Sequence, residues 1–311
     1  MYTPYLKGKQ FEFLALRDLA EFFSAEEKEK VLPIVEPVKK STRDASTAFQ
    51  KMIGARWKFA LVLNPRLGDF QRGDNDYYSL VSAELEPNRD AWVPAFILDK
   101  KSDVKSMIEA GDFKNVMLIL PKDEDVDPWA ELISSDVVKY VVICDGDSMP
   151  TVRKVRRLGD KELIRMDDSF KAQQKNADYA GDIDHRFTDR HSYYNDFGFA
   201  GFGDYTTLPS AFIEGGVSPS VVAIHLTYNK NSDEVWIHHF LSDPKVKGNE
   251  NVQGKFFDAA VQVEPFFNER PADKTPAIDE LVKQVKAKHY PGLGQIKKYS
   301  MKHHIILMSK F

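Results

Sequence analysis

Residues 115–145 read NVMLILPKDEDVDPWAELISSDVVKYVVICD and hold the pattern that decides the fold. The runs VMLIL at 116–120 and YVVIC at 140–144 are apolar without alternation, which is typical of strands buried on both faces. Between them lies PWAELISS, residues 128–135, in which the apolar residues have helical spacing. A buried strand, a helix and a second buried strand in this order predict βα units on a parallel sheet.

The same alternation recurs along the chain. Short runs rich in β-branched and aromatic residues are separated by helical segments such as FEFLALRDLAEFF and TAFQKMIGA. We predict eight strands, at Tyr2–Lys7, Leu32–Pro37, Lys58–Asn64, Trp92–Asp99, Asn115–Leu120, Lys139–Asp145, Lys161–Asp167 and Phe199–Tyr205. This pattern favours an α/β fold, a TIM-like (β/α)8 barrel. The alternative is an open doubly wound sheet, in which the eighth strand and the residues after it form an antiparallel edge.

The last third of the chain has a different pattern. SVVAIHLTY at 220–228 and EVWIHHF at 234–240 flank the polar spacer NKNSD, which predicts a β-hairpin outside the barrel. We therefore expect residues 1–215 to form the (β/α)8-like barrel, and residues 216–311 to form a hairpin and a helical C-terminal extension packed on it. The extension is expected to hold helices at 256–263 and 276–290, and a strand or a helix at 303–311.

The connection after the seventh strand, from Asp168 to Gly198, is too long and too polar for a simple loop. It is either a lid or a folded excursion. It contains enough Asp and His side chains for a metal site, among them Asp182, Asp184 and His185. Their spacing matches no established ligand pattern, so we predict no metal site.

Composition narrows the functional classes. The 311 residues include 43 Lys and Arg against 47 Asp and Glu, a balance that indicates neither nucleic acid nor an anionic membrane as a partner. The single cysteine, Cys144, forms no internal disulfide. The N-terminus lacks the pattern of a signal peptide and no apolar run reaches the length of a membrane span, so we expect a cytoplasmic protein. No motif identifies a cofactor.

Candidate site residues follow from the barrel fold, because the loops after the strands form the active face of such barrels. Glu36 is the most pointed candidate, since it lies in the apolar run PIVEPV, where an acid needs a partner or a function. As catalytic residues we predict Glu36, Glu12, Asp167 and Asp204, and as substrate-binding residues Lys7, Lys9, Arg165, Tyr205 and His304. The glycines of GFGDYTT, residues 201–207, could let backbone amides approach an anion. The simpler explanation of each charge is that the chain is leaving the core for water.

Two stretches also carry a family resemblance. YTPYLKGKQFEFLAL at 2–16 and LPIVEPV at 32–38 resemble the opening of the beta-protein family, bacterial and phage or mobile-element proteins of undetermined function. GFGDYTT, AIHLTY, EVWIHHF and HHIILM are similar to later landmarks of that family, although Phe11 stands where relatives have glycine. The resemblance implies a role in phage defence or mobile-element conflict. It emphasises Lys7, Lys9, Glu12, Glu36, Asp204 and His304.

Two functions remain open. The first is an enzyme acting on a phosphorylated small molecule or a nucleotide at the barrel mouth, where Lys7 and Lys9 hold anionic oxygens and Glu36 is the acid or base. The second is a non-catalytic scaffold that binds a partner, such as a nuclease-like protein, through its hairpin and tail. A mouth that gathers Lys9, Glu12, Glu36 and Asp204 favours the enzyme, and a mouth plugged by apolar side chains favours the scaffold.

Overall fold

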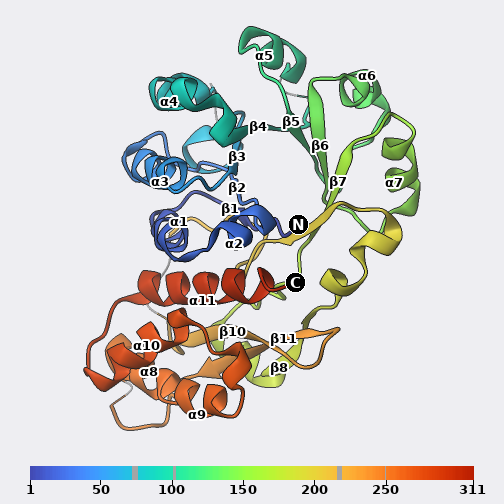
Figure 1. The fold of residues 1–311 in the computed structure, drawn as a ribbon. Coiled ribbons are helices and arrows are strands. Elements are labelled where there is room, and N and C mark those ends of the chain that lie inside the picture. Colours follow the sequence, from blue (N-terminus) through green and yellow to red (C-terminus); the bar gives the residue numbers. More distant parts are fainter. Residues whose placement is uncertain (72–75, 101–102, 216–218, 249) are drawn as a thin grey trace. The chain divides into compact units, whose positions relative to one another are not determined.

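Eight parallel strands form one sheet, and their order in the sheet is their order in the chain (Figure 1). This computed structural model describes residues 1–71, 76–100, 103–215, 219–248 and 250–311. The strands are β1 (Tyr5–Leu6), β2 (Ile34–Val35), β3 (Phe59–Val62), β4 (Trp92–Ile97), β5 (Val116–Leu120), β6 (Val138–Ile143), β7 (Glu162–Asp167) and β9 (Gly201–Asp204). A doubly wound sheet needs a reversal of strand order, which is absent from this sheet. The predicted TIM-like barrel is therefore confirmed, with each strand at its predicted place.

The barrel closes where β9 meets the chain just before β1. The Thr3 amide donates to the Phe202 carbonyl at 2.8 Å, and the Phe202 amide donates to the Met1 carbonyl at 3.0 Å. A Cβ on Gly203 would lie 2.1 Å from the Thr3 carbonyl oxygen, and one on Gly201 would lie 2.8 Å from that of Met1. The two glycines of GFGDYTT thus permit the close approach of the last strand to the first.

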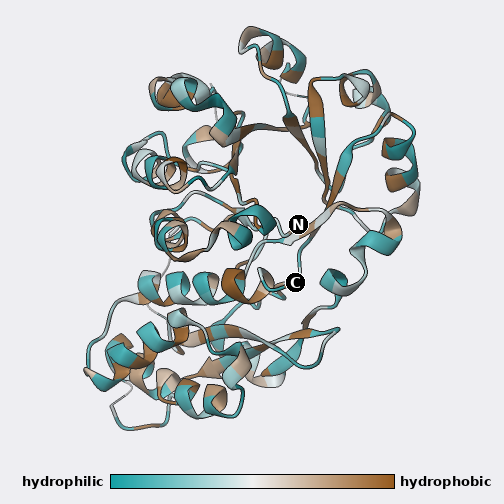
Figure 2. Ribbon diagram, viewed as in Figure 1, coloured by the Kyte–Doolittle hydropathy of each residue, from teal (hydrophilic) through white to brown (hydrophobic). Residues whose placement is uncertain are grey.

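Helices follow the strands and cover the outside of the sheet (Figure 1). They are α1 (Gln10–Phe22), α2 (Ala25–Lys30), α3 (Arg43–Gly54), α4 (Tyr78–Leu85), α5 (Val104–Ala110), α6 (Ala130–Ser134) and α7 (Met149–Arg156). In Figure 2 the barrel strands are mostly hydrophobic, whereas the helices have one hydrophobic and one hydrophilic side. This is the pattern expected when strands are buried on both faces and helices on one.

Apolar side chains fill the inside of the barrel. The cluster contains Tyr5, Leu32, Ile34, Ala60, Val62, Val93, Ala95, Met117, Ile119, Val142, Ile164 and Met166. Within a strand these residues are two apart, as the pleat requires. The barrel is therefore a packed core, and any chemistry belongs to its ends.

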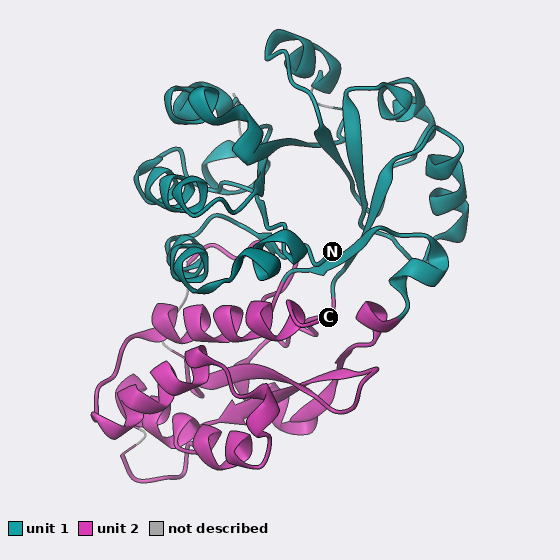
Figure 3. Cartoon of the chain, viewed as in Figure 1, with its two compact units in different colours: residues 1–168, 193–205 teal, residues 169–192, 206–311 magenta. Residues whose placement is uncertain are grey.

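The chain divides into two compact units (Figure 3). Residues 1–168 and 193–205 form the first, which is the barrel, and residues 169–192 and 206–311 form the second. The sequence predicts a boundary between residues 215 and 216, and residues 216–218 lie outside those that the structure describes.

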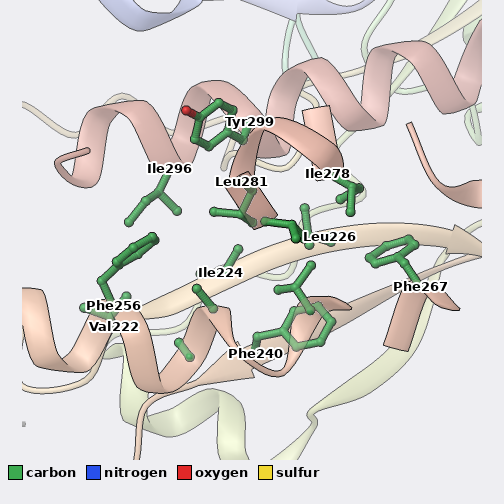
Figure 4. Packing of buried hydrophobic residues seen from close by; sticks show 14 of the residues in the cluster. Val222, Ile224, Leu226, Phe240, Phe256, Phe267, Ile278, Leu281, Ile296 and Tyr299 are labelled. Atoms are coloured by element: carbon green, nitrogen blue, oxygen red, sulfur yellow. The ribbon is translucent and has the colours of Figure 1, made fainter. Parts of the chain in front are cut away.

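The second unit is a three-stranded antiparallel sheet with helices. Strands β10 (Ala223–Asn229) and β11 (Val235–Leu241) form the predicted hairpin, and β8 (Asp184–Thr188) pairs with β11. The helices are α8 (Val252–Ala260), α9 (Val263–Asn268), α10 (Pro276–Lys286) and α11 (Leu293–Met308), so the terminal run is helical. Figure 4 shows the core of this unit, in which Ile224, Leu226 and Phe240 of the hairpin pack against helical residues such as Leu281.

Strand β8 shows that the long connection after β7 is a folded excursion. Its pattern DHRFT escaped prediction because the strand is short and two of its five residues are charged. His185 and Phe187 are buried, while Arg186 is exposed, so the segment alternates as an edge strand does.

Several histidines of the second unit are buried as neutral rings. His239, fully buried, shares a hydrogen bond of 2.7 Å between its Nδ1 and that of His225. His303, also fully buried, lies 2.6 Å through Nε2 from the Thr227 carbonyl oxygen and 2.9 Å through Nδ1 from the Thr275 hydroxyl. Burial lowers the pKa of His239 to about 2 and that of His303 to about 3.

We expect a Gly203→Ala variant to lose about 2 kcal/mol or more of unfolding free energy, because its methyl group would overlap the Thr3 carbonyl. Urea unfolding measures this loss. Gly54→Ala is the matched control in the same unit, because a Cβ at Gly54 meets nothing within 4 Å. A Gly203→Ala variant as stable as Gly54→Ala would contradict the proposed role of the seam.

We expect the second unit to lose stability as the pH falls below about 6.5, the pKa of a histidine in an unfolded chain. The folded pKa values of His239 and His303 are depressed, so the unfolded chain binds more protons from about pH 6.5 down to about pH 3. Over this range each ring lowers the free energy of unfolding by about 1.4 kcal/mol for every unit by which the pH falls. Thermal unfolding from pH 7.5 to 5 should show a smaller decline for His239→Gln than for a His289→Gln control, whose ring is exposed. Equal declines would refute the assignment.

Candidate functional site at the barrel mouth

A ring of polar residues continues the inside of the barrel beyond the carboxyl ends of the strands. The pleat places every second residue on one face, so the interior positions Ile34, Val62 and Val142 are followed by Glu36, Asn64 and Cys144. By the same count the other members of the ring are Lys7, Asp99, Asp168 and Tyr205. The apolar filling of the barrel thus ends in a polar layer at the face where such barrels hold their active sites.

Glu36 lies at the centre of the contacts in this layer. Its side chain is only 4% exposed, and its Oε2 accepts the Tyr5 hydroxyl at 2.7 Å while its Oε1 accepts the Arg66 backbone amide at 3.0 Å. Burial raises the pKa of Glu36, and these two bonds and the charge of Lys7 oppose the rise. Because both oxygens act as acceptors, the geometry suits a carboxylate that takes up a proton.

Lys7 shares this environment. It is 7% exposed, and its Nζ lies 5.7 Å from the centre of the Tyr205 ring. Burial lowers the pKa of Lys7. The negative charge of Glu12 raises the pKa of Lys7 and partly offsets the effect of burial, whereas the positive charge of Lys9 lowers this pKa further. The mouth therefore favours the neutral amine more than water does.

Tyr205, just after the last strand of the barrel, contacts Tyr5 in the first strand. Its ring centre lies 5.1 Å from that of Tyr5, and its hydroxyl bonds to the Cys144 thiol. Burial raises the pKa of Cys144 to about 12, so this thiol is protonated at neutral pH. The next residue, Thr206, has a φ of 57°, a left-handed conformation that is strained for a β-branched side chain. The backbone that directs Tyr205 into the mouth is thus held in an unusual shape.

Glu12 and Lys9 serve the start of helix α1. The Glu12 Oε2 accepts the Lys9 amide at 2.7 Å, and the Lys7 amide also bonds to this carboxylate. Burial raises the pKa of Glu12 despite these bonds. Glu12 therefore caps the helix and adds negative charge near Lys7, while the side chain of Lys9 is exposed at the same turn.

Three predicted site residues, Arg165, Asp167 and Asp204, lie on the outer face of the barrel strands, away from the interior. Arg165 and Asp167 alternate with the interior residues Ile164 and Met166, and they bond to each other at 2.7 Å. Arg165 also bonds to Asp147 at 2.7 Å. This cluster binds the loop after β6 to the end of β7.

Asp204 likewise alternates with the interior. It accepts the Tyr2 hydroxyl at 2.8 Å next to the closing seam, where the rings of Tyr2 and Phe202 are in contact. His304 belongs to the second unit, where its Nδ1 lies 2.9 Å from the Thr227 hydroxyl. Of the predicted residues, the structure brings together Lys7, Glu12, Glu36 and Tyr205.

Two members of the site were missed by sequence reasoning. Tyr5 resembles an ordinary core aromatic, and only its bond to Glu36 reveals another role. Arg66, which donates its amide to Glu36 and forms a 3.5 Å ion pair with Asp99, comes two residues after the predicted strand end. Its sequence signal was a basic residue shortly after the end of a predicted strand, as with Lys9 after the first strand.

Searches of known protein families, curated proteins and solved structures found no match to this chain. Within the part of the chain that the structure describes, no three His, Cys, Asp or Glu side chains are grouped to hold a metal ion. Nor is any described helix long and apolar enough to cross a membrane.

We expect Glu36→Gln to be at least as stable as the parent protein at pH 7, because no charge is then buried. The Gln oxygen can accept the Arg66 amide while its NH2 group donates to the Tyr5 hydroxyl oxygen. The pKa of Glu36 is higher in the folded protein than in the unfolded chain. The folded state is therefore stabilised by the protonated side chain below about pH 4.5, and this stabilisation is lost as the pH rises through the folded pKa. The advantage of the variant should therefore shrink from pH 7 toward pH 4.5. Urea unfolding of both proteins across this range measures it. A loss of about 3 kcal/mol at pH 7 would instead identify a structural ion pair with Lys7.

Proposed function

We propose that the barrel unit is an enzyme that acts on a phosphorylated or nucleotide-like substrate at its mouth, with Glu36 as the acid or base. One observation carries the proposal: a buried carboxylate is held by Tyr5 and the Arg66 amide beside a buried lysine. A stable core has no need of such an arrangement, since burying charge costs free energy. Groups with displaced pKa values in a polar layer are typical of active sites.

The charges around Glu36 support an anionic substrate. Lys7 and the Arg66 guanidinium both act on Glu36 electrostatically, and Lys9 lies exposed at the turn after β1. These three cations could hold phosphate oxygens while Glu36 removes or returns a proton. Tyr5 and Tyr205 add aromatic surface for a ring or a sugar.

The resemblance to the beta-protein family supports a biological setting for this reaction. We propose a role in phage defence or mobile-element conflict, with a nuclease-like protein as the partner. The scaffold alternative predicts a mouth plugged by apolar side chains, whereas Glu36, Lys7 and Asn64 are buried polar residues there. Of the four residues expected to gather for an enzyme, Glu12 and Glu36 lie near Lys7 and Lys9 is at the same turn, but Asp204 faces away from the interior and bonds to Tyr2.

We expect AMP, ATP or inorganic pyrophosphate to raise the melting temperature of the protein, and Arg66→Gln to reduce this shift. Lys122→Gln is the control, because Lys122 is an exposed cation just after β5 on the same face. Glu36→Gln should keep the shift but abolish protection in a phage-challenge assay, since it retains the binding cations and loses the acid or base. Protection that survives in Glu36→Gln, together with a copurifying partner and no shift with any of the three compounds, would establish the scaffold instead.

A further inference from the structure

We propose that Lys7 is a nucleophile that forms an imine with a carbonyl group of the substrate. This inference rests on the proposed function in placing the substrate at the mouth, and it adds a chemical class. The substrate would be an aldehyde or a ketone that also carries an anionic group. Lys7 would then bond covalently to the carbonyl carbon, and Arg66 and Lys9 would hold the anion.

The position of Lys7 supports this role. It follows β1, two residues beyond the interior residue Tyr5, so the pleat directs it along the inside of the barrel toward the mouth. Its side chain is 7% exposed and approaches the face of Tyr205.

An amine attacks a carbonyl only when it is neutral, and two features of the site favour the neutral form. Lys7 has lost much of its contact with water, and a second cation, Lys9, lies two residues away. Desolvation and a neighbouring cation are the established means of activating a lysine for imine formation. The carboxylates of Glu12, Glu36 and Asp168 act in the opposite direction, yet the pKa of Lys7 is lowered.

Glu36 and Tyr5 can manage the protons of this reaction. The Lys7 nitrogen forms a bond to the carbonyl carbon, the π electrons of the carbonyl pass to its oxygen, and that oxygen takes up a proton. The nitrogen gives up one of its two protons to form a carbinolamine. The oxygen then takes up a second proton, the C–O bond breaks with release of water, and the nitrogen loses its other proton to give the neutral imine. The amine and the carbonyl are thus converted into an imine and water, without oxidation or reduction. The Glu36 carboxylate can accept the proton of the nitrogen and return it to the departing oxygen, and Tyr5 holds it in place.

The test uses two aldehydes that differ only in phosphate, pyridoxal 5′-phosphate and pyridoxal. The full-length protein is treated with a limiting amount of either aldehyde at pH 7, the imine is reduced with sodium cyanoborohydride, and the adducts are located by peptide mass spectrometry. We expect Lys7 to be labelled first, severalfold faster than the exposed Lys122 and Lys9. The labelling rate of Lys7 should also remain high at a pH where that of Lys122 has fallen.

Lys7→Arg keeps the positive charge but forms no such imine, so its adduct at position 7 should disappear while Lys122 is labelled as before. Lys122→Arg is the matched control and should leave the Lys7 adduct unchanged. Since the first measurement is made on the parent protein, the test does not depend on the folding of either variant. Labelling of Lys7 no faster than of Lys122, with both aldehydes, would overturn the inference.

The two aldehydes separate this inference from the proposed function. Because pyridoxal is partly masked as its internal hemiacetal, the two aldehydes are compared as the ratio of labelling at Lys7 to labelling at Lys122. A higher ratio with pyridoxal 5′-phosphate than with pyridoxal would support both proposals. Equal ratios, with Lys7 still labelled faster than Lys122, would support the imine and count against the phosphate site. A melting shift with AMP or pyrophosphate, combined with no selective adduct at Lys7, would support the phosphate site and refute the imine.

Discussion

The arrangement of the barrel depends on how closely β9 approaches the chain at Thr3. At Gly203 there is no room for even a methyl group, because the Thr3 carbonyl oxygen occupies the position that a Cβ would take. This approach allows the seam hydrogen bonds to form, and it brings residues about 200 apart in sequence into register. Tyr205, two residues after Gly203, thereby meets Tyr5 and Lys7, two and four residues after Thr3. Without the seam there would be no mouth in which first and last strands share a site.

The barrel interior changes character along its axis. Its middle is filled by residues such as Ile34, Val62 and Met117, whose burial stabilises the fold in proportion to the apolar area removed from water. One step further along the strands the interior holds Glu36, Lys7 and Asn64. Asn64 exchanges two hydrogen bonds of 2.9 Å with the backbone of Ile97, so it extends the sheet. Glu36 and Lys7 are the buried charges of this layer, and burying a charge costs free energy.

The sequence predicted the barrel well because its strands are buried on both faces and appear as apolar runs, such as VMLIL. The same property hid the details of the site. A run without alternation does not reveal which residues face inward, so the predicted site also included Arg165, Asp167 and Asp204, which do not face the interior. Only the register of the sheet separates them. Glu36 and Lys7 were identifiable, since charge inside or beside an apolar strand is unusual. The bond from Tyr5, and the strand β8, depend on partners distant in the chain and could not be read locally.

The interleaving of the two units has a consequence during synthesis on the ribosome. Strand β8 is made before β9, yet its partner β11 emerges only after the barrel sequence is complete. The nascent barrel can therefore close at Tyr205 while β8 still waits with an unpaired edge, a state that invites association with other nascent chains. The charged residues of β8, Asp184 and Arg186, oppose such pairing. The same two charges made the strand hard to recognise in the sequence, and they disfavour its pairing with other chains before β11 is synthesised.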